Sequence, residues 1–239
     1  MTTSRPVLEV KGLRAAYGHA QVLFGVDLSL RRGEVAALMG RNGAGKTTTF
    51  KAIMRLVPPN GGTVTFEGRD VTGMEPFRIA RLGLGYVPEE RRIFTDLTVY
   101  ENLEIGRKSA VDGREAWSPE RLFTIFPNLA EMKGRRASAM SGGEQQMLTI
   151  ARTLMGNPHA VLLDEPSEGL APVIVEQMAE AVLRMKQEGI AVLLSEQNLH
   201  FASAVSDRAY VIEKGVIRYE GSTEELEAND ELREAYLTV

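Results

Sequence analysis

The sequence predicts an α/β fold with a mainly parallel β-sheet. Short apolar runs, typical of strands buried on both faces, alternate along the chain with amphipathic segments at helical spacing. The apolar runs lie at 34–39, 84–87, 160–163 and 190–194, and helices are expected at about 46–55 and 173–188. Strands joined through helices become parallel neighbours, which indicates a sheet covered by helices.

Three other regions extend this core. Residues 7–30 alternate apolar residues with small turns and predict antiparallel strands. Residues from about 98 to 156 are mostly helical in pattern and look like an insertion into the core. Residues 208–220 predict a hairpin that turns at Lys214 and Gly215, and a polar helical tail follows it.

Composition narrows the class of protein. Of the 239 residues, 44% are hydrophobic and 25% charged, which is ordinary for a soluble globular protein. The chain has no cysteine, so disulfides and cysteine metal sites are excluded, and a reducing compartment fits. The net charge of -4, without a strong basic patch, argues against a nucleic-acid partner.

No segment is expected to cross a membrane. The first ten residues lack the basic stretch and apolar core of a signal peptide. The longest apolar runs are far shorter than the ~20 residues that a membrane-spanning helix needs. A role at a membrane would therefore require something other than this chain to hold it there.

A phosphate-binding loop is the strongest motif. Residues 40–47 match G-x-x-x-x-G-K-[ST], between a predicted strand and a predicted helix. The glycines let backbone N–H groups approach phosphate oxygens, Lys46 supplies charge for the outer phosphates, and Thr47 offers a hydroxyl to Mg²⁺. A chance glycine turn before a lysine is the alternative, and the flanking elements argue against it. The residues predicted to bind nucleotide here are Gly40, Arg41, Asn42, Gly43, Ala44, Gly45, Lys46, Thr47 and Thr48.

A second acidic motif follows the strand at 160–163. Asp164 is expected beside Mg²⁺, and Glu165 is expected to orient and deprotonate the attacking water. Neighbouring strand residues point in opposite directions, so both carboxylates face the site only if the chain turns at the strand end. The alternative is a solvated acidic turn, and the phosphate loop upstream disfavours it.

A third segment, 140–146, begins a predicted helix. Ser141 and Glu144 form a capping-box pattern, which is a sufficient structural reason for those two residues. It does not explain Gly142 and Gly143, because glycine is disfavoured in a helix. A helix N-terminus with exposed N–H groups binds anions, so a second phosphate site is indicated.

Together these motifs resemble the ATP-binding cassette (ABC) ATPases, from about residue 7 to the C-terminus. The resemblance implies a P-loop NTPase fold over 1–239 as one domain. Its parts are a RecA-like parallel core, an N-terminal antiparallel β subdomain and an inserted α-helical subdomain at about 95–157. It also implies that two cassettes enclose two ATP molecules head to tail. Ser141, Gly142, Gly143 and Glu144 of one cassette then face the phosphate loop of the other.

The resemblance assigns further positions. Tyr17 is similar to the aromatic residue that stacks on adenine, although an ordinary strand tyrosine is the alternative. Glu89 stands where most members have Gln, a residue that reaches the metal site and senses the membrane partner. Gln197 stands where most have His, and its amide can still donate to a γ-phosphate. Residues 167–171 resemble the loop that crosses the dimer interface.

Four segments, at 89–94, 140–147, 167–172 and 196–198, are similar to the LivF-type branch of this family. That branch powers importers of branched-chain and other hydrophobic amino acids. The resemblance implies a second ABC ATPase, two transmembrane permeases, an extracytoplasmic solute-binding protein acting indirectly, and a peripheral position on the cytoplasmic face of the inner membrane.

Three alternatives stay open. An importer of urea, amides or another small solute belongs to the same class. A soluble ABC ATPase acting on ribosomes or nucleic acid belongs to another class, but such proteins resemble tandem cassettes or carry coiled-coil or zinc insertions. A regulatory binder that does not hydrolyse ATP is expected to lack the base, whereas Glu165 is present.

Overall fold

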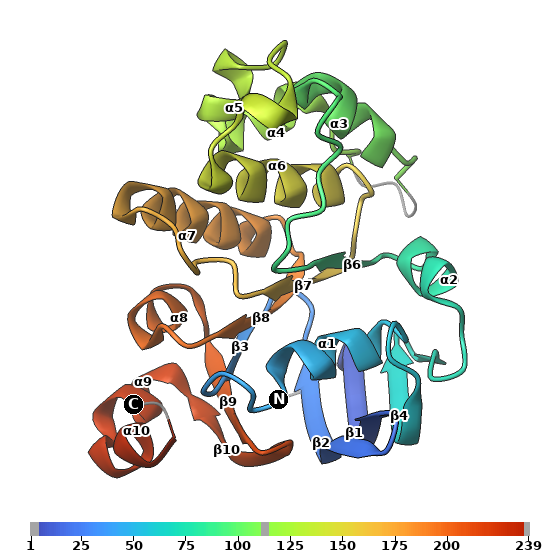
Figure 1. Cartoon of the computed structure of the whole chain (residues 1–239), viewed down its shortest axis with the longest axis vertical. Helices are drawn as coiled ribbons and strands as arrows, with labels where there is room; N and C mark the ends of the chain where they lie inside the picture. Colours follow the sequence, from blue (N-terminus) through green and yellow to red (C-terminus); the bar gives the residue numbers. More distant parts are fainter. Residues whose placement is uncertain (1–4, 111–114, 237–239) are drawn as a thin grey trace.

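The computed structural model describes residues 5–110 and 115–236, and a six-stranded sheet forms its centre (Figure 1). The order across this sheet is β10 (Val216–Ser222), β9 (Arg208–Glu213), β3 (Val35–Met39), β8 (Ala191–Glu196), β7 (Ala160–Asp164) and β6 (Leu84–Val87). All strands but β10 are parallel, as the alternating pattern predicts. Their carboxyl ends therefore meet along one edge.

A second, antiparallel sheet carries the N-terminal part of the chain. Its order is β2 (Ala20–Leu30), β1 (Leu8–Tyr17), β4 (Pro59–Phe66) and β5 (Arg69–Asp70). Helix α1 (Lys46–Ile53) packs against β1, β2 and β7 and joins the two sheets. This confirms the antiparallel prediction for residues 7–30.

Helices occupy the region predicted as an insertion and gather at the top of Figure 1. They are α3 (Val99–Gly106), α4 (Pro119–Ile125), α5 (Pro127–Glu131) and α6 (Gly142–Leu154), with a 3₁₀ turn at Ala137–Ala139. Helix α7 (Pro172–Gln187) lies between this group and the sheet. Helices α9 (Thr223–Ala228) and α10 (Asp230–Tyr236) form the polar tail, whose last residues, 237–239, lie outside the described residues.

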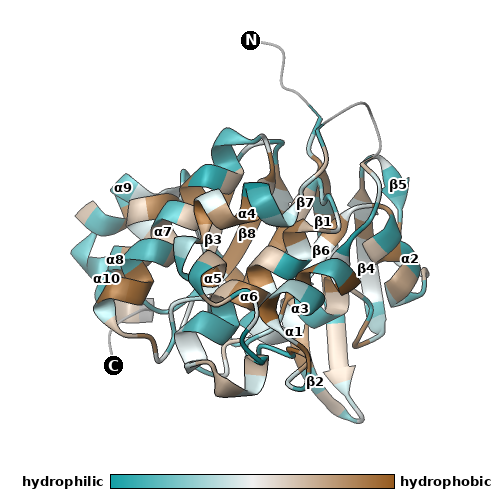
Figure 2. Cartoon of the chain, turned by 90° about the horizontal axis from the view of Figure 1, so that it is seen from above, coloured by the Kyte–Doolittle hydropathy of each residue, from teal (hydrophilic) through white to brown (hydrophobic). Residues whose placement is uncertain are grey.

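The central sheet separates two apolar clusters. Along β3, Val35, Ala37 and Met39 join the cluster on the helical side, whereas Ala36 and Leu38 join the cluster beneath the antiparallel sheet. This alternation is the two-residue period of a strand buried on both faces. Figure 2 shows the strands inside the molecule as mostly hydrophobic, while the surrounding helices carry hydrophilic segments.

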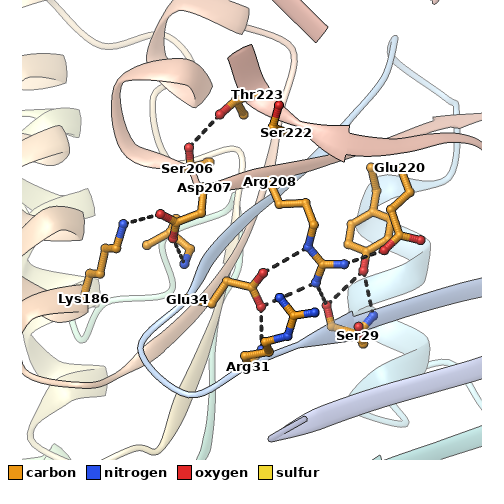
Figure 3. Close-up of polar contacts among 12 residues, drawn as sticks. Ser29, Arg31, Glu34, Lys186, Ser206, Asp207, Arg208, Glu220, Ser222 and Thr223 are labelled. Atoms are coloured by element: carbon orange, nitrogen blue, oxygen red, sulfur yellow. Dashed lines mark hydrogen bonds and ion pairs between the residues drawn. The ribbon is translucent and has the colours of Figure 1, made fainter. Parts of the chain in front are cut away.

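Charged side chains tie together the end of the sheet where β3 begins (Figure 3). Arg208 forms an ion pair with Glu34 at 3.0 Å, a second with Glu220, and donates to the Ser29 carbonyl at 2.8 Å. Asp207 pairs with Lys186 and accepts the backbone N–H of residue 35 at 3.0 Å. These contacts join β2, β9 and β10 to the start of β3.

Two helices were not predicted: α2 (Pro76–Arg81) and α8 (Leu199–Val205). Each is shorter than two turns, so hydrophobic periodicity cannot reveal it. The hairpin prediction is confirmed, and Lys214 (φ 47°) and Gly215 (φ 75°) take the left-handed conformations that a tight turn of this kind requires.

Candidate nucleotide-binding site

The phosphate loop connects β3 to α1. Gly43 (φ 77°) and Gly45 (φ 114°) take left-handed conformations, and α1 begins at the residue after Gly45. At Gly40, a Cβ atom would lie 2.5 Å from the Ile212 carbonyl oxygen of β9. The Gly215 N–H of the hairpin turn donates to the Ala44 carbonyl at 2.8 Å. The loop is therefore shaped by the β9–β10 hairpin as well as by its own glycines.

Lys46 lies almost entirely inside the protein, with 3% of its surface exposed. Its ammonium donates to the carbonyls of Gly40 at 2.7 Å and Arg41 at 3.2 Å. It also forms an ion pair with Glu165 at 3.0 Å. The positive charge predicted for the outer phosphates is thus held at the loop by acceptors that a nucleotide can replace.

Asp164 is the last residue of β7 and is fully buried. Its Oδ1 accepts the hydroxyls of Thr47 at 3.1 Å and Ser195 at 2.7 Å, and its Oδ2 accepts the hydroxyl of Tyr86 at 3.1 Å. Burial raises the pKa of Asp164 although these bonds oppose it, and the charge of Glu165 raises it further. A nearby cation would relieve this penalty.

The backbone turns away from the direction of β7 at Glu165. Its φ of 46° is uncommon for a residue other than glycine and turns the side chain toward Lys46. This turn is what the sequence argument required for two adjacent carboxylates to face one site. Burial acts to raise the pKa of Glu165, but hydrogen bonds with Glu168 and Lys46 and the charge of Lys46 hold it below its usual value.

Gln197 follows β8 and reaches the same point. Its side-chain amide donates to Asn42 Oδ1 at 2.8 Å and to Glu165 Oε2 at 3.0 Å. It therefore connects the phosphate loop to Glu165. A neutral histidine has one ring N–H and could make only one of these two hydrogen bonds. The neutral NH₂ group of Gln197 makes both.

Two further carboxylates line the pocket that contains Lys46, Thr47 and Thr48. Partial burial and the charges of Glu165 and Asp164 raise the pKa of Glu89. A hydrogen bond with Glu165, together with burial, raises the pKa of Glu168 to about 7. The pocket is rich in carboxylate oxygens beside a phosphate loop.

These oxygens are suitable ligands for Mg²⁺. When a nucleotide supplies phosphate oxygens, Mg²⁺ usually needs only one or two ligands from the protein. The Thr47 hydroxyl and the Asp164 carboxylate lie 3.1 Å apart at the loop, and both are hard oxygen donors. Within residues 5–110 and 115–236, no group of three or more His, Asp or Glu side chains could hold a metal alone.

The segment at 141–144 lies elsewhere. Ser141 caps α6, its backbone N–H donates to Glu144 at 2.6 Å, and so the capping box is present. None of these four residues is among the described residues that line the Lys46 pocket. Both glycines also have close neighbours in this chain, because a Cβ would lie 2.3 Å from the Arg91 guanidinium at Gly142 and 2.8 Å from Ile174 at Gly143.

Tyr17 ends β1 with 49% of its surface exposed. It is not among the described residues that line the Lys46 pocket, whereas Val22 of the neighbouring strand is. Its exposed ring is free to stack, so its predicted contact with adenine stays a prediction.

The sequence motifs do not predict three residues that lie in this site: Tyr86, Ser195 and Glu168. Ser195 lies opposite Asp164 in the register of β7 and β8, so the predicted strand ends could have indicated it. Tyr86 stands close to Glu89 in the sequence and Glu168 lies within the segment 167–171, but nothing in their spacing shows which way their side chains point.

A separate groove runs between the central sheet and the helical region. It is lined by residues of α2, β6, α3 and α6, among them Phe77, Ile105 and Arg152. Phe77 is 53% exposed and Ile105 is 54% exposed. Apolar side chains that are exposed together along a groove form the kind of surface that another molecule can cover.

Comparison with known proteins gives one consistent family. The profile described as ABC transporter matches residues 23–168. A high-affinity branched-chain amino acid transport ATP-binding protein, BraG of Pseudomonas aeruginosa, is 40% identical over 92% of this chain and 95% of its own. A probable branched-chain amino acid transport ATP-binding protein, LivF of Archaeoglobus fulgidus, is 33% identical over 92% and 94%. The lipopolysaccharide export ATP-binding protein LptB of Escherichia coli is 33% identical over 96% of each chain.

Solved structures agree on the fold. An ATP-binding cassette of an ABC transporter in its ADP conformation superposes with a TM-score of 0.81 at 27% identity, covering 97% of this chain and 98% of that one. A structure described as the ATP-binding subunit of an ABC transporter gives a TM-score of 0.81 at 30% identity, over 97% and 96%. Among the described residues, no helix has the length and hydropathy of a membrane span. The chain therefore belongs to the ABC transporter ATP-binding family and is an ATPase.

Proposed function

We propose that this chain is the motor subunit of an importer for branched-chain or other hydrophobic amino acids. The observation that carries the proposal is the 40% identity with BraG, which extends over 92% of this chain. The whole of 1–239 serves as one cassette, with about 95–157 as its helical insertion. The chain sits on the cytoplasmic face of the cell membrane, where permease subunits hold it.

Residues 40–48 bind the phosphates of ATP, and Tyr17 stacks on the adenine. Lys46 neutralises the outer phosphates. Supporting this, its ammonium already lies at the loop, within 3.0 Å of Glu165. On ATP binding the phosphates replace Glu165 as its partner, which frees that carboxylate for a water molecule. Thr47, Asp164 and Glu89 hold Mg²⁺, whose chemistry is to draw charge from the phosphates.

Glu165 is the general base. The Gln197 amide holds one of its oxygens at 3.0 Å and so fixes the direction in which the other accepts a proton. Gln197 also contacts Asn42 at 2.8 Å, so a nucleotide that shifts the loop also shifts the base. We infer that Glu165 is ionised in the resting protein, because its pKa is held below the usual value.

Ser141, Gly142, Gly143 and Glu144 complete the site of a partner cassette. The support is that they form the N-terminus of α6, a place where backbone N–H groups attract anions, and that none of them lines their own chain's pocket. Closure of the two cassettes then encloses ATP. The permeases are gripped by the groove that contains Phe77 and Ile105, and an extracytoplasmic binding protein delivers the amino acid to them.

The test is a mild-detergent purification of the tagged chain from its native membranes, followed by identification of all bound proteins. Two multi-span permeases and a second cassette ATPase are the expected partners. The companion binding protein is then titrated with leucine, isoleucine and valine, and with urea as the contrasting solute. Recovery of ribosomal proteins, or failure to bind any apolar amino acid, would overturn the proposal.

The likeness to LptB supports a second candidate, an export motor for a lipopolysaccharide. The same experiment separates the two candidates, because an exporter would copurify without an amino-acid-binding protein. Deleting the gene gives an independent measure. If the chain powers an importer, the deletion strain should take up labelled leucine more slowly and keep an unchanged amount of surface lipopolysaccharide.

A further inference from the structure

Tyr86 touches two regions that the proposed function treats separately. It lies on β6, at the edge of the central sheet. Its hydroxyl donates to Asp164 Oδ2 at 3.1 Å, inside the nucleotide site. Tyr86 is also one of the residues that line the groove containing Phe77 and Ile105. This single residue thus connects the groove to the Asp164 carboxylate.

The bond to Asp164 is placed to control how that carboxylate is turned. Thr47 and Ser195 both donate to Oδ1. Among the described residues, Tyr86 provides the one hydrogen bond to Oδ2. A carboxylate held by donors on both oxygens has a fixed plane, whereas removing the donor on one oxygen leaves rotation about the Cβ–Cγ bond less restricted.

The ring is also placed to respond to an occupant of the groove. Tyr86 is only partly buried, and its ring packs against the cluster beneath the antiparallel sheet. Met54, Leu84 and Gly85 line the groove around it. An apolar segment that filled the groove would contact Tyr86, and any tilt of the ring would move the hydroxyl, because the two are coplanar.

We propose that Tyr86 is a positioning residue that sets the orientation of Asp164 toward Mg²⁺ and makes this orientation depend on the occupant of the groove. The second part rests on the proposed function, in which a permease segment is that occupant. Tyr86 transfers no proton and contacts no reacting atom.

The test compares Tyr86→Phe with Tyr210→Phe. Tyr210 is a matched control because its hydroxyl is also hydrogen-bonded, to the backbone N–H and carbonyl of Ser29 at 3.0 Å each, but lies at the opposite end of the sheet. Calorimetry measures the ATP dissociation constant of each purified cassette with Mg²⁺ and with EDTA. Thermal unfolding measures the cost to the fold.

In Tyr86→Phe the concentration of Mg²⁺ needed for half-maximal tightening of ATP binding should rise about 10-fold, the lower end of the effect of removing a group that orients a metal ligand. ATP affinity in EDTA should stay the same. Tyr210→Phe should leave both quantities unchanged and lower the unfolding temperature only. An unchanged Mg²⁺ requirement in Tyr86→Phe overturns the positioning role, as does an equal change in both variants.

The dependence on the groove is tested in the purified transporter. The ratio of ATP turnover with permeases to turnover of the cassettes alone should fall in Tyr86→Phe and stay at the wild-type value in Tyr210→Phe. A wild-type ratio in Tyr86→Phe overturns the link. If the wild-type protein itself shows no stimulation by permeases, it is the proposed function that fails, and the Mg²⁺ titration still decides the positioning role.

Discussion

The two ends of the central sheet hold charges in opposite ways. At the end where β3 begins, each of these carboxylates has a cationic partner. Arg208 forms ion pairs with Glu34 and Glu220, and Lys186 forms one with Asp207. At the carboxyl end, Asp164, Glu165, Glu168 and Glu89 gather, and among the described residues Lys46 is the one cation in ion-pair contact with the group. Burial raises the pKa of Asp164 and Glu89, and a hydrogen bond with Glu165 raises the pKa of Glu168.

This difference shows at which end of the sheet the charges are balanced within the protein and at which end they are not. In a matched network every desolvated charge has a partner, so removing one partner destabilises the fold. An unmatched cluster costs stability and is retained where a ligand supplies the missing charge. Lys46 alone does not balance the carboxylates at the carboxyl end, and a divalent cation bound beside Asp164 would offset part of their negative charge. Substitutions at the two ends should therefore differ in kind.

The largest effect is expected at the carboxyl end from Glu165→Gln. ATP turnover should fall at least about 100-fold, because a general base is removed. ATP should still bind and hold the cassettes in a stable dimer, measurable by size exclusion with ATP and Mg²⁺. Glu34→Gln, at the other end, is the control and should keep turnover per folded molecule. Unchanged turnover in Glu165→Gln would show that another group acts as base.

At the matched end, Arg208→Met should reduce stability and spare nucleotide binding. Leaving Glu34 buried without its cation costs about 3 kcal/mol or more, which lowers the unfolding temperature by roughly 6–12 °C in a chain of this size. Arg218→Met, which breaks an exposed pair with Glu213, should cost less than about 1 kcal/mol. If Arg208→Met weakened ATP binding at temperatures where it stays folded, the two ends would not be independent.

Lys46→Ala should weaken ATP binding by about 10- to 100-fold, the value of one or two lost hydrogen bonds to charged groups. Calorimetry with the isolated cassette measures this. Lys51→Ala, in the same helix but paired with Glu90 at 3.9 Å, is the control and should change the affinity less than 3-fold, roughly the worth of an exposed pair. Normal affinity in Lys46→Ala would remove the role of the phosphate loop.

The smallest effect concerns Glu168, whose carboxyl has a pKa of about 7 in the folded protein against an ordinary value of 4.5. Between these values the unfolded chain releases this proton and the folded chain keeps it, so the wild-type protein loses stability as pH rises through that window. Glu168→Gln avoids this loss. Without nucleotide, its unfolding temperature should match the wild type below pH 4.5 and exceed it above pH 7, by at most about 2 °C because the side chain is exposed. If the two proteins differed in unfolding temperature by the same amount at every pH, the titration of Glu168 could not be the cause.

Much of this site could be predicted because its motifs are contiguous. The loop at 40–47 and the pair Asp164 and Glu165 reveal themselves by spacing and by the apolar strands before them. Tyr86 could not be found in this way, since its contact with Asp164 depends on how two distant strands pair. The same holds for Arg208, whose partners come from two separate parts of the chain, 29–34 and Glu220.

Gly215 carries a consequence for the order in which the protein becomes functional during synthesis. A Cβ there would overlap the Val22 carbonyl, and its own N–H holds the Ala44 carbonyl. The phosphate loop is translated early, yet part of its scaffold is a turn near the other end of the chain. A ribosome-bound fragment that ends before β9 lacks this scaffold and gains little from ATP, since a ligand stabilises only the state that binds it. The nascent chain must reach its last strands before nucleotide can protect it.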